Sequence, residues 1–306
     1  MAPEQFDPET ERHIAREVER RLAAKLKDHR DRKSLILEGI NRIFEEALTC
    51  TTEEELGVTC LRVAEEITGS QFGFIGEIGA DGLLHDLAMS DPGWKLCTMY
   101  DQSGHRRPPG DFPVHGLYGR VVAESEPLLT NAPADHPASI GTPEGHPPIT
   151  SFLGVPLNHG GQTFGLIALA NPPGGYRAQD LDSIEALTPA IVQSLLRFRT
   201  QEALRQSEER HRTLFENMTE GFALGEAIFD HQENPRDFRF IEINQTFQNQ
   251  SGLTPEILGR PMTEVLPNLE RHWIERYCGV AQSGRQIRFE EYNQDTDKHY
   301  DVFCYR

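Results

Sequence analysis

One long helix-forming stretch, from near Ala178 to about Asn217, constrains the fold of this chain most, because it separates two regions rich in strand-forming sequence. Its apolar residues recur at helical spacing, at Leu181, Ile184, Leu187, Ile191, Leu195 and Phe198. Pro189 lies inside the stretch, where a kink or a break is compatible with the pattern. A chain of 306 residues is long enough for two domains. The sequence therefore predicts two sheet-containing domains joined by a helix.

Residues 1–34 form a separate helical arm in this prediction. Strong helix formers dominate residues 10–34, and apolar side chains recur every four residues among charges, at Ile14, Val18, Leu22 and Leu26. A narrow apolar stripe on a charged helix is typical of a coiled-coil seam, so we expect a homodimer. A solvated helix that packs on its own domain is the alternative.

The first domain is expected over residues 35–198. Helical patterns cover Leu35–Leu48 and Leu56–Thr68, with a capping box at Thr52 and Glu55. Two hairpins follow, and their strands are Phe72–Ile78, Leu83–Met89, 151–157 and 163–170. The Pro-, Gly- and His-rich residues 91–150 lie between the hairpins, with one helical stretch near Leu117–Glu124.

The second domain is expected over residues 207–306, after a connecting helix at 199–216. Its strands are predicted at 222–229, 238–243, 286–292 and 299–305, with a longer helix at 269–283. The order strand, strand, helices, strand, strand predicts an α+β domain with a mainly antiparallel sheet. The fold class of the whole chain is therefore α+β, with two such domains in series.

Composition limits the kinds of partner and the cellular compartment that we expect for this chain. The formal net charge is −18, and most of it lies in residues 35–198. Because an acidic surface repels phosphate groups, we do not expect the chain to bind nucleic acid. No apolar run approaches the roughly 20 residues of a membrane helix, and no secretory signal is visible at the N-terminus. The five cysteines are odd in number and lack a C-x-x-C pair. That usage fits a reducing compartment, and we expect a cytoplasmic location.

Residues 35–198 resemble a GAF domain. The resemblance depends on Ser151-Phe-Leu-Gly-Val-Pro-Leu157, on Gly161-Gln-Thr-Phe-Gly-Leu-Ile-Ala-Leu-Ala-Asn171, and on Tyr176 with Asp180-Leu181. Residues 207–306 resemble a PAS domain through the segments Ser207–Asn217, Phe240–Phe247, Ser251–Thr254, Leu258–Pro261 and Gly284–Phe289. The last strand of a PAS sheet has no counterpart after Arg306, so we expect a fragment of a longer protein.

Both resemblances imply the sensory input module of a signal-transduction protein, most commonly a sensor histidine kinase in a two-component system or a cyclic-di-nucleotide enzyme. Neither output domain is visible in this chain, so we expect no enzymatic activity of its own and a downstream kinase or cyclase domain as partner. A ligand in the GAF domain would act by favouring one arrangement of a helical dimer. A thiol-based GAF enzyme and a structural spacer without a ligand are the alternatives.

Residues 91–150 contain the expected ligand site of the GAF domain. The resemblance allows haem there, with Cys97 as anchor and one histidine as axial ligand to the haem iron; His146 is the first candidate for that ligand and His136 the second. His115 and Tyr118 are further cofactor-binding candidates. A bilin is a weaker alternative, suggested by Asp111-Phe-Pro113 and Tyr118. The plainest alternative is that these side chains have only structural roles, with an unidentified metabolite or nothing bound.

Overall fold

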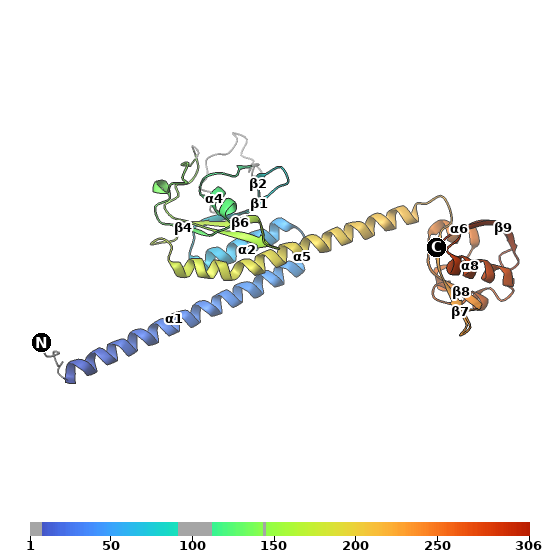
Figure 1. Ribbon diagram of the computed structural model, residues 1–306, viewed down its shortest axis with the longest axis horizontal. Helices are drawn as coiled ribbons and strands as arrows, with labels where there is room; N and C mark the ends of the chain where they lie inside the picture. The colour runs from blue at the N-terminus through green and yellow to red at the C-terminus, as the bar shows by residue number, and fades with distance from the viewer. Residues whose placement is uncertain (1–7, 91–111, 143–144) are drawn as a thin grey trace. The chain divides into compact units, whose positions relative to one another are not determined.

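The computed structural model describes residues 8–90, 112–142 and 145–306 (Figure 1). The chain divides into two compact units, Met1–Glu202 and Ala203–Arg306. Helix α5 (Ala178–Glu216) runs from the first unit into the second and continues through Pro189. The Thr188 hydroxyl donates a 2.9 Å hydrogen bond to the carbonyl of Glu185, the acceptor that a proline at position 189 leaves without its usual N–H donor. This local repair explains why the helix does not end there.

A six-stranded sheet forms the centre of the first unit. Its strand order is β3-β2-β1-β6-β5-β4, and neighbouring strands are antiparallel. The strands are β1 (Phe72–Ile78), β2 (Leu83–Met89), β3 (Phe112–Pro113), β4 (Leu128–Thr130), β5 (Phe152–His159) and β6 (Gln162–Ala170). Both predicted hairpins are present, β1–β2 and β5–β6, and β1 pairs with β6 to join them.

Three helices cover one face of this sheet, namely α1 (Pro8–Thr49), α2 (Glu53–Thr68) and α5 (Figure 1). The predicted arm and the first predicted helix of the GAF-like region are one continuous helix, α1. Thr52 and Glu55 form the capping box of α2 as expected. The core beneath these helices is closely filled by aliphatic side chains, including Ile43, Leu61, Ile75, Leu153, Ile167, Ile184, Leu187 and Leu195.

The opposite face of the sheet is covered by the short helix α4 (Gly116–Glu124), and we call it the α4 face (Figure 1). A second apolar cluster lies there, formed by Leu84, Val121, Leu128, Phe152, Leu166 and Ala168, with Phe74, Ile78 and Tyr118 packed against it. The 3₁₀ turn η1 (Pro133–Asp135) follows β4. Among the described residues, one face of the sheet is thus covered by long helices and the other by α4 and loops.

The second unit contains four strands and four short helical segments. The strands form two antiparallel pairs, β7 (Ala223–Phe229) with β8 (Pro235–Ile243) and β9 (Ile287–Asn293) with β10 (Lys298–Cys304). The helical segments are α6 (Gln245–Ser251), η2 (Pro255–Ile257), α7 (Met262–Val265) and α8 (Arg271–Ser283). All four strands and the longer helix occur where the sequence predicts them.

Asn244 connects the end of α5 to the second unit. It is fully buried, and its side-chain oxygen accepts hydrogen bonds from the backbone N–H groups of Phe222 (2.9 Å) and Phe247 (2.8 Å). Its amide nitrogen donates to the carbonyls of Phe215 (3.2 Å) and Glu220 (2.9 Å). Every polar atom of this buried amide is therefore engaged, as burial requires.

The fold class is α+β, as predicted: helices and antiparallel strands are mixed in both units, and α1 precedes them. Among the described residues, no helix is both long enough and apolar enough to span a bilayer. The core of the first unit therefore positions two features that concern function, the α4 face and helix α5.

Candidate functional site

Asp86 places a carboxyl group on the α4 face. It stands two positions after the buried Leu84 on β2, and alternate residues of a strand point to the same side of the sheet. Its Oδ2 atom is buried and has no hydrogen-bond partner among the described residues. Burial raises the pKa of Asp86 to about 7, and the nearby His85 opposes that rise. A buried carboxyl without a partner is unusual, and at a functional site it is available to a ligand.

Tyr118, on α4, lies close to this carboxyl. Burial raises the pKa of Tyr118, and the charge of Asp86 raises it further. The hydroxyl donates to the carbonyl of Pro113 at 3.1 Å, and the ring meets Phe74 of β1 edge to face with centroids 6.2 Å apart. The α4 face therefore contains one acidic side chain and two aromatic rings close together, namely Asp86, Tyr118 and Phe74.

His115 is the predicted site residue that the structure brings to Tyr118. Its Nδ1 atom lies 3.2 Å from the tyrosine hydroxyl, and the two rings are 5.5 Å apart. His115 also occupies the N-cap position of α4, although its side chain makes no capping hydrogen bond. His115 and Tyr118 are thus neighbours.

His136 lies apart from this pair and already has partners. Its Nε2 is 3.1 Å from Nη1 of Arg120, and its Nδ1 is 3.2 Å from the backbone nitrogen of Ala138. The residue directly follows the turn η1. A ligand role for His136 would require these contacts to break.

His146 has one ring nitrogen engaged by the backbone. Its Nδ1 lies 2.7 Å from the carbonyl of Pro147, a contact in which the ring N–H donates. Such a bond fixes the tautomer and leaves Nε2 as the nitrogen with a free lone pair. The ring is partly buried, and its donor chemistry fits haem iron. Cys97, the expected anchor, lies outside the described residues.

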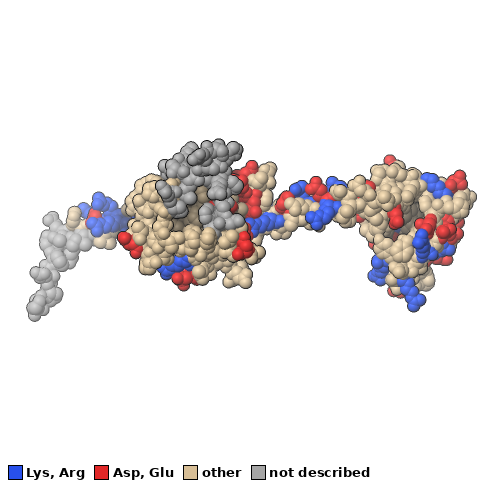
Figure 2. Space-filling model, turned by 90° about the horizontal axis from the view of Figure 1, so that it is seen from above, with Lys and Arg blue, Asp and Glu red and all other residues tan. Residues whose placement is uncertain are grey.

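The histidines do not form a metal site of their own. In residues 8–90, 112–142 and 145–306, no group of three or more His, Cys, Asp or Glu side chains is arranged to hold a metal ion. Figure 2 shows Lys and Arg (blue) and Asp and Glu (red) over the described surface. The side chains clustered beneath α4 are mostly apolar. An apolar face with a few polar groups is typical of a small-molecule site.

The described cysteines are poor nucleophiles. Burial raises the pKa of Cys60 to about 12, and it also raises the pKa values of Cys50, Cys278 and Cys304. Because the thiolate is the reactive form, these thiols are held in their inert state at neutral pH.

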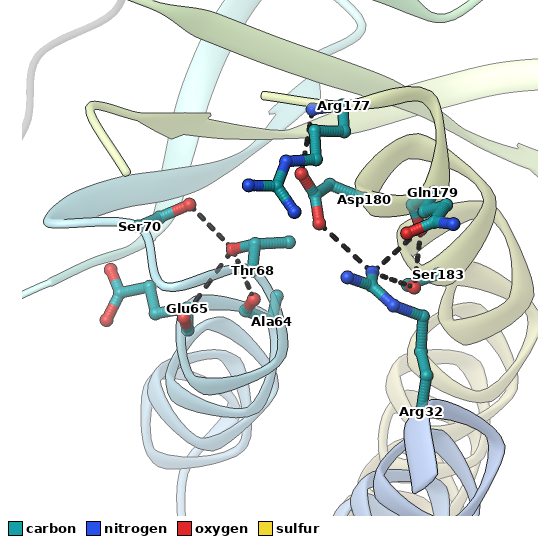
Figure 3. A network of polar contacts seen from close by, with 9 residues as sticks. All are labelled: Arg32, Ala64, Glu65, Thr68, Ser70, Arg177, Gln179, Asp180 and Ser183. Atoms are coloured by element: carbon teal, nitrogen blue, oxygen red, sulfur yellow. Dashed lines mark hydrogen bonds and ion pairs between the residues drawn. The ribbon is translucent and has the colours of Figure 1, made fainter. Parts of the chain in front are cut away.

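Arg32 and Asp180 fix the start of α5 against α1 (Figure 3). One guanidinium nitrogen of Arg32 donates to the carbonyl of Gln179 (2.9 Å), to Oδ1 of Asp180 (3.0 Å) and to the hydroxyl of Ser183 (2.9 Å). The other oxygen of Asp180 accepts from the backbone N–H of Arg177 at 2.8 Å. Asp180, selected from the sequence as part of the GAF pattern, therefore closes the N-terminus of the helix.

Arg199 holds α5 near the end of the first unit. It lies 19 positions beyond Asp180 and contacts Glu77 of β1 through both terminal nitrogens, one of them at 2.6 Å. Its Nε donates to Glu53, the first residue of α2. Sequence analysis did not find this cluster or Asp86. The period-2 pattern of β2 could have placed Asp86 beside Leu84, whereas no local pattern relates residues more than 120 positions apart.

Two family models match the chain, a GAF domain over residues 50–195 and a PAS domain over residues 209–283. The chain contains a GAF domain followed by a PAS domain. The first corresponds to the six-stranded unit and the second begins within the C-terminal part of α5.

Among known proteins, the chain is similar to a methyl sulfide methyltransferase-associated sensor of Methanosarcina acetivorans, with 27% identity over 146 residues. That match covers 46% of this chain and 14% of the other protein, so the chain spans a small part of its relative. The GAF domain of an Acinetobacter phosphoenolpyruvate-protein phosphotransferase has 13% identity and a TM-score of 0.43, covering 55% of this chain and 97% of that one. A methyl-accepting chemotaxis protein segment has 13% identity and a TM-score of 0.42, covering 53% and 99%.

Proposed function

We propose that this chain is the sensory input module of a signalling protein, in which a small molecule bound on the α4 face of the GAF domain biases a helical homodimer. One observation carries the proposal: α5 is at once the last helix of the GAF domain and the entry to the PAS domain. A continuous helix conveys a displacement along its length because its residues move together. The output partner in this proposal is a histidine kinase or cyclic-di-nucleotide domain.

Exposed apolar side chains support the homodimer. Val18, Leu22 and Leu26 of α1 are 57%, 56% and 62% exposed. Their spacing of four residues forms a stripe of the kind that a second helix covers. Further along α1, a groove of about 440 Å³ lies between α1 and α5, and its walls include Ile36, Leu37, Ile40 and Ala186.

Haem is the first ligand to test. His146 would hold the iron through Nε2, and bound haem would supply redox or gas-binding chemistry. Asp86 and Tyr118 would provide polar contacts, and the apolar side chains of the α4 face would exclude water. The raised pKa values of Cys50 and Cys60 make these two thiols poor candidates for a nucleophile, and the proposal assigns no catalysis to the chain itself.

The absorption spectrum of the purified chain, with and without haemin, tests the ligand. We expect a Soret band that His146→Ala shifts or removes and that His159→Ala leaves unchanged, because His159 is an exposed residue at the end of β5. Cys97→Ala tests attachment separately, through extraction of the pigment into acidified organic solvent. Absence of a Soret band under both conditions would contradict the haem assignment. The ligand of the module would then have to be a different small molecule.

A further inference from the structure

Arg199 stands at the point where α5 leaves the GAF core. Leu195 is buried in the core beneath the helices, and Phe198 packs against it. From Thr200 to Leu214 the helix has no buried residue. The cluster of Arg199, Glu77 and Glu53, which we call the Arg199 clamp, therefore connects α5 to β1 and α2 directly after the buried part of the helix.

The geometry of the clamp is that of a specific contact. The guanidinium meets the Glu77 carboxylate through two nitrogens, the two-pronged arrangement that adds directionality to charge. The hydrogen bonds that Arg199 donates to Glu77, and then to Glu53, raise the pKa of Arg199, so the arginine stays charged. The three side chains are 27–33% exposed, so solvent screens their charges. Breaking these ion pairs therefore costs little free energy, and the clamp can open.

Strand β1 places this clamp and the α4 face on opposite sides of one backbone. Phe74 and Ile78 pack with the cluster of the α4 face, whereas Ile75 lies in the helix-covered core and Glu77 reaches Arg199. In the β1–β2 ladder, Glu77 pairs with His85 and its neighbour Gly76 pairs with Asp86. The unpartnered carboxyl of Asp86 is thus one register position from the strand residue that holds α5.

We propose that the Arg199 clamp is the coupling element through which the α4 face controls helix α5. A displacement of β1 or β2 on that face moves Glu77, and the clamp passes the displacement to the helix at its point of exit. Coupling of this kind needs an element with two arrangements whose balance both sites shift. A partly exposed ion-pair cluster supplies a closed and an open arrangement. The inference rests on the proposed sensory function and names Arg199 as its positioning residue.

Hydrogen exchange of the full chain, measured by mass spectrometry on α5 peptides covering 195–206, tests the coupling. Arg199→Gln should raise exchange there by about three- to fivefold, the scale of a partly exposed ion pair. Arg197→Gln is the matched control, because Arg197 is an exposed arginine on the same helix. Glu77→Gln should reproduce Arg199→Gln, and the double variant should add little.

A purely structural role would also loosen the helix, so a second perturbation is needed. Phe74→Leu alters the α4 face without touching the clamp. We expect it to raise exchange at 195–206 in the wild-type and Arg197→Gln backgrounds, and to add nothing in the Arg199→Gln background. An equal effect of Phe74→Leu in all three backgrounds would overturn the proposal, as would equal exchange in Arg199→Gln and Arg197→Gln. No ligand is used, so a failed haemin titration and a failed coupling test remain distinct results.

Discussion

Asp86 illustrates at the scale of one residue how a site group can oppose stability. The group loses its proton near pH 3.9 in an unfolded chain, whereas burial raises its pKa to about 7 in the folded one. Between these values the folded chain holds one proton more than the unfolded chain. The free energy of unfolding therefore falls as pH rises from about 4 to about 7. Glu65, whose pKa burial raises to about 7, contributes in the same direction.

Asp86→Asn should stabilise the GAF domain at pH 8 by about 1–2 kcal/mol, because an unpartnered buried amide costs less than an unpartnered carboxylate. The gain should shrink as the pH falls to 5, where the wild-type carboxyl is protonated. Thermal denaturation from pH 5 to 8 measures both effects. Asp182→Asn, at an exposed carboxyl on α5, should change little across the range. A lower melting temperature for Asp86→Asn at pH 8 would contradict the assignment of Asp86 as unpaired.

At the scale of elements, the close approach of β1 and β6 requires small residues, and Gly165 is one of them. A Cβ added at Gly165 would lie 2.3 Å from the carbonyl oxygen of Gly76 and 3.1 Å from Cα of Glu77. Both are backbone atoms, so the strands would have to separate. The family pattern that includes Gly165 thus has a physical basis in the close approach of these two strands.

Gly165→Ala should therefore destabilise the GAF domain by roughly 2–4 kcal/mol, the range of severe packing conflicts. Hydrogen exchange of the β1 and β6 amides gives the local free energy. Gly279→Ala on α8 is the control, since a Cβ there meets nothing within 4 Å and alanine is the better helix former. If Gly165→Ala lowers the free energy of unfolding no more than Gly279→Ala changes it, the sheet adjusts to the added methyl group more easily than its geometry indicates.

The sequence predicted the elements far better than the contacts between them. Periodic apolar patterns located the two hairpins and α5, because burial of one face imposes those periods. The same patterns could not reveal that the arm and the following helix are continuous as α1. Nor could these patterns predict that Arg199 contacts Glu77 or that Asp86 lacks a hydrogen-bond partner. Both features depend on how distant segments pack together.

At the scale of the whole molecule, the homodimer is the prediction that a solution measurement can check. Leu22→Glu should lower the mass measured by light scattering from that of a dimer toward that of a monomer, because a charge would enter the apolar seam of α1. Ala24→Glu adds the same charge two positions away, on the opposite side of the helix, and should leave the mass unchanged. A monomer mass for the wild-type chain at high concentration would contradict the seam.

The continuity of α5 also has a consequence for engineering chimeric sensors from this chain. Each residue inserted into or deleted from an α-helix rotates everything after it by about 100°. Seven residues make nearly two full turns and preserve the phase, whereas three or five change it. An insertion or deletion in the exposed segment between Thr200 and Leu214 would therefore keep or change the rotation, about the helix axis, of the domain that follows. The number of residues added or removed decides which of the two occurs. The sequence of that segment can vary more freely than its number of residues.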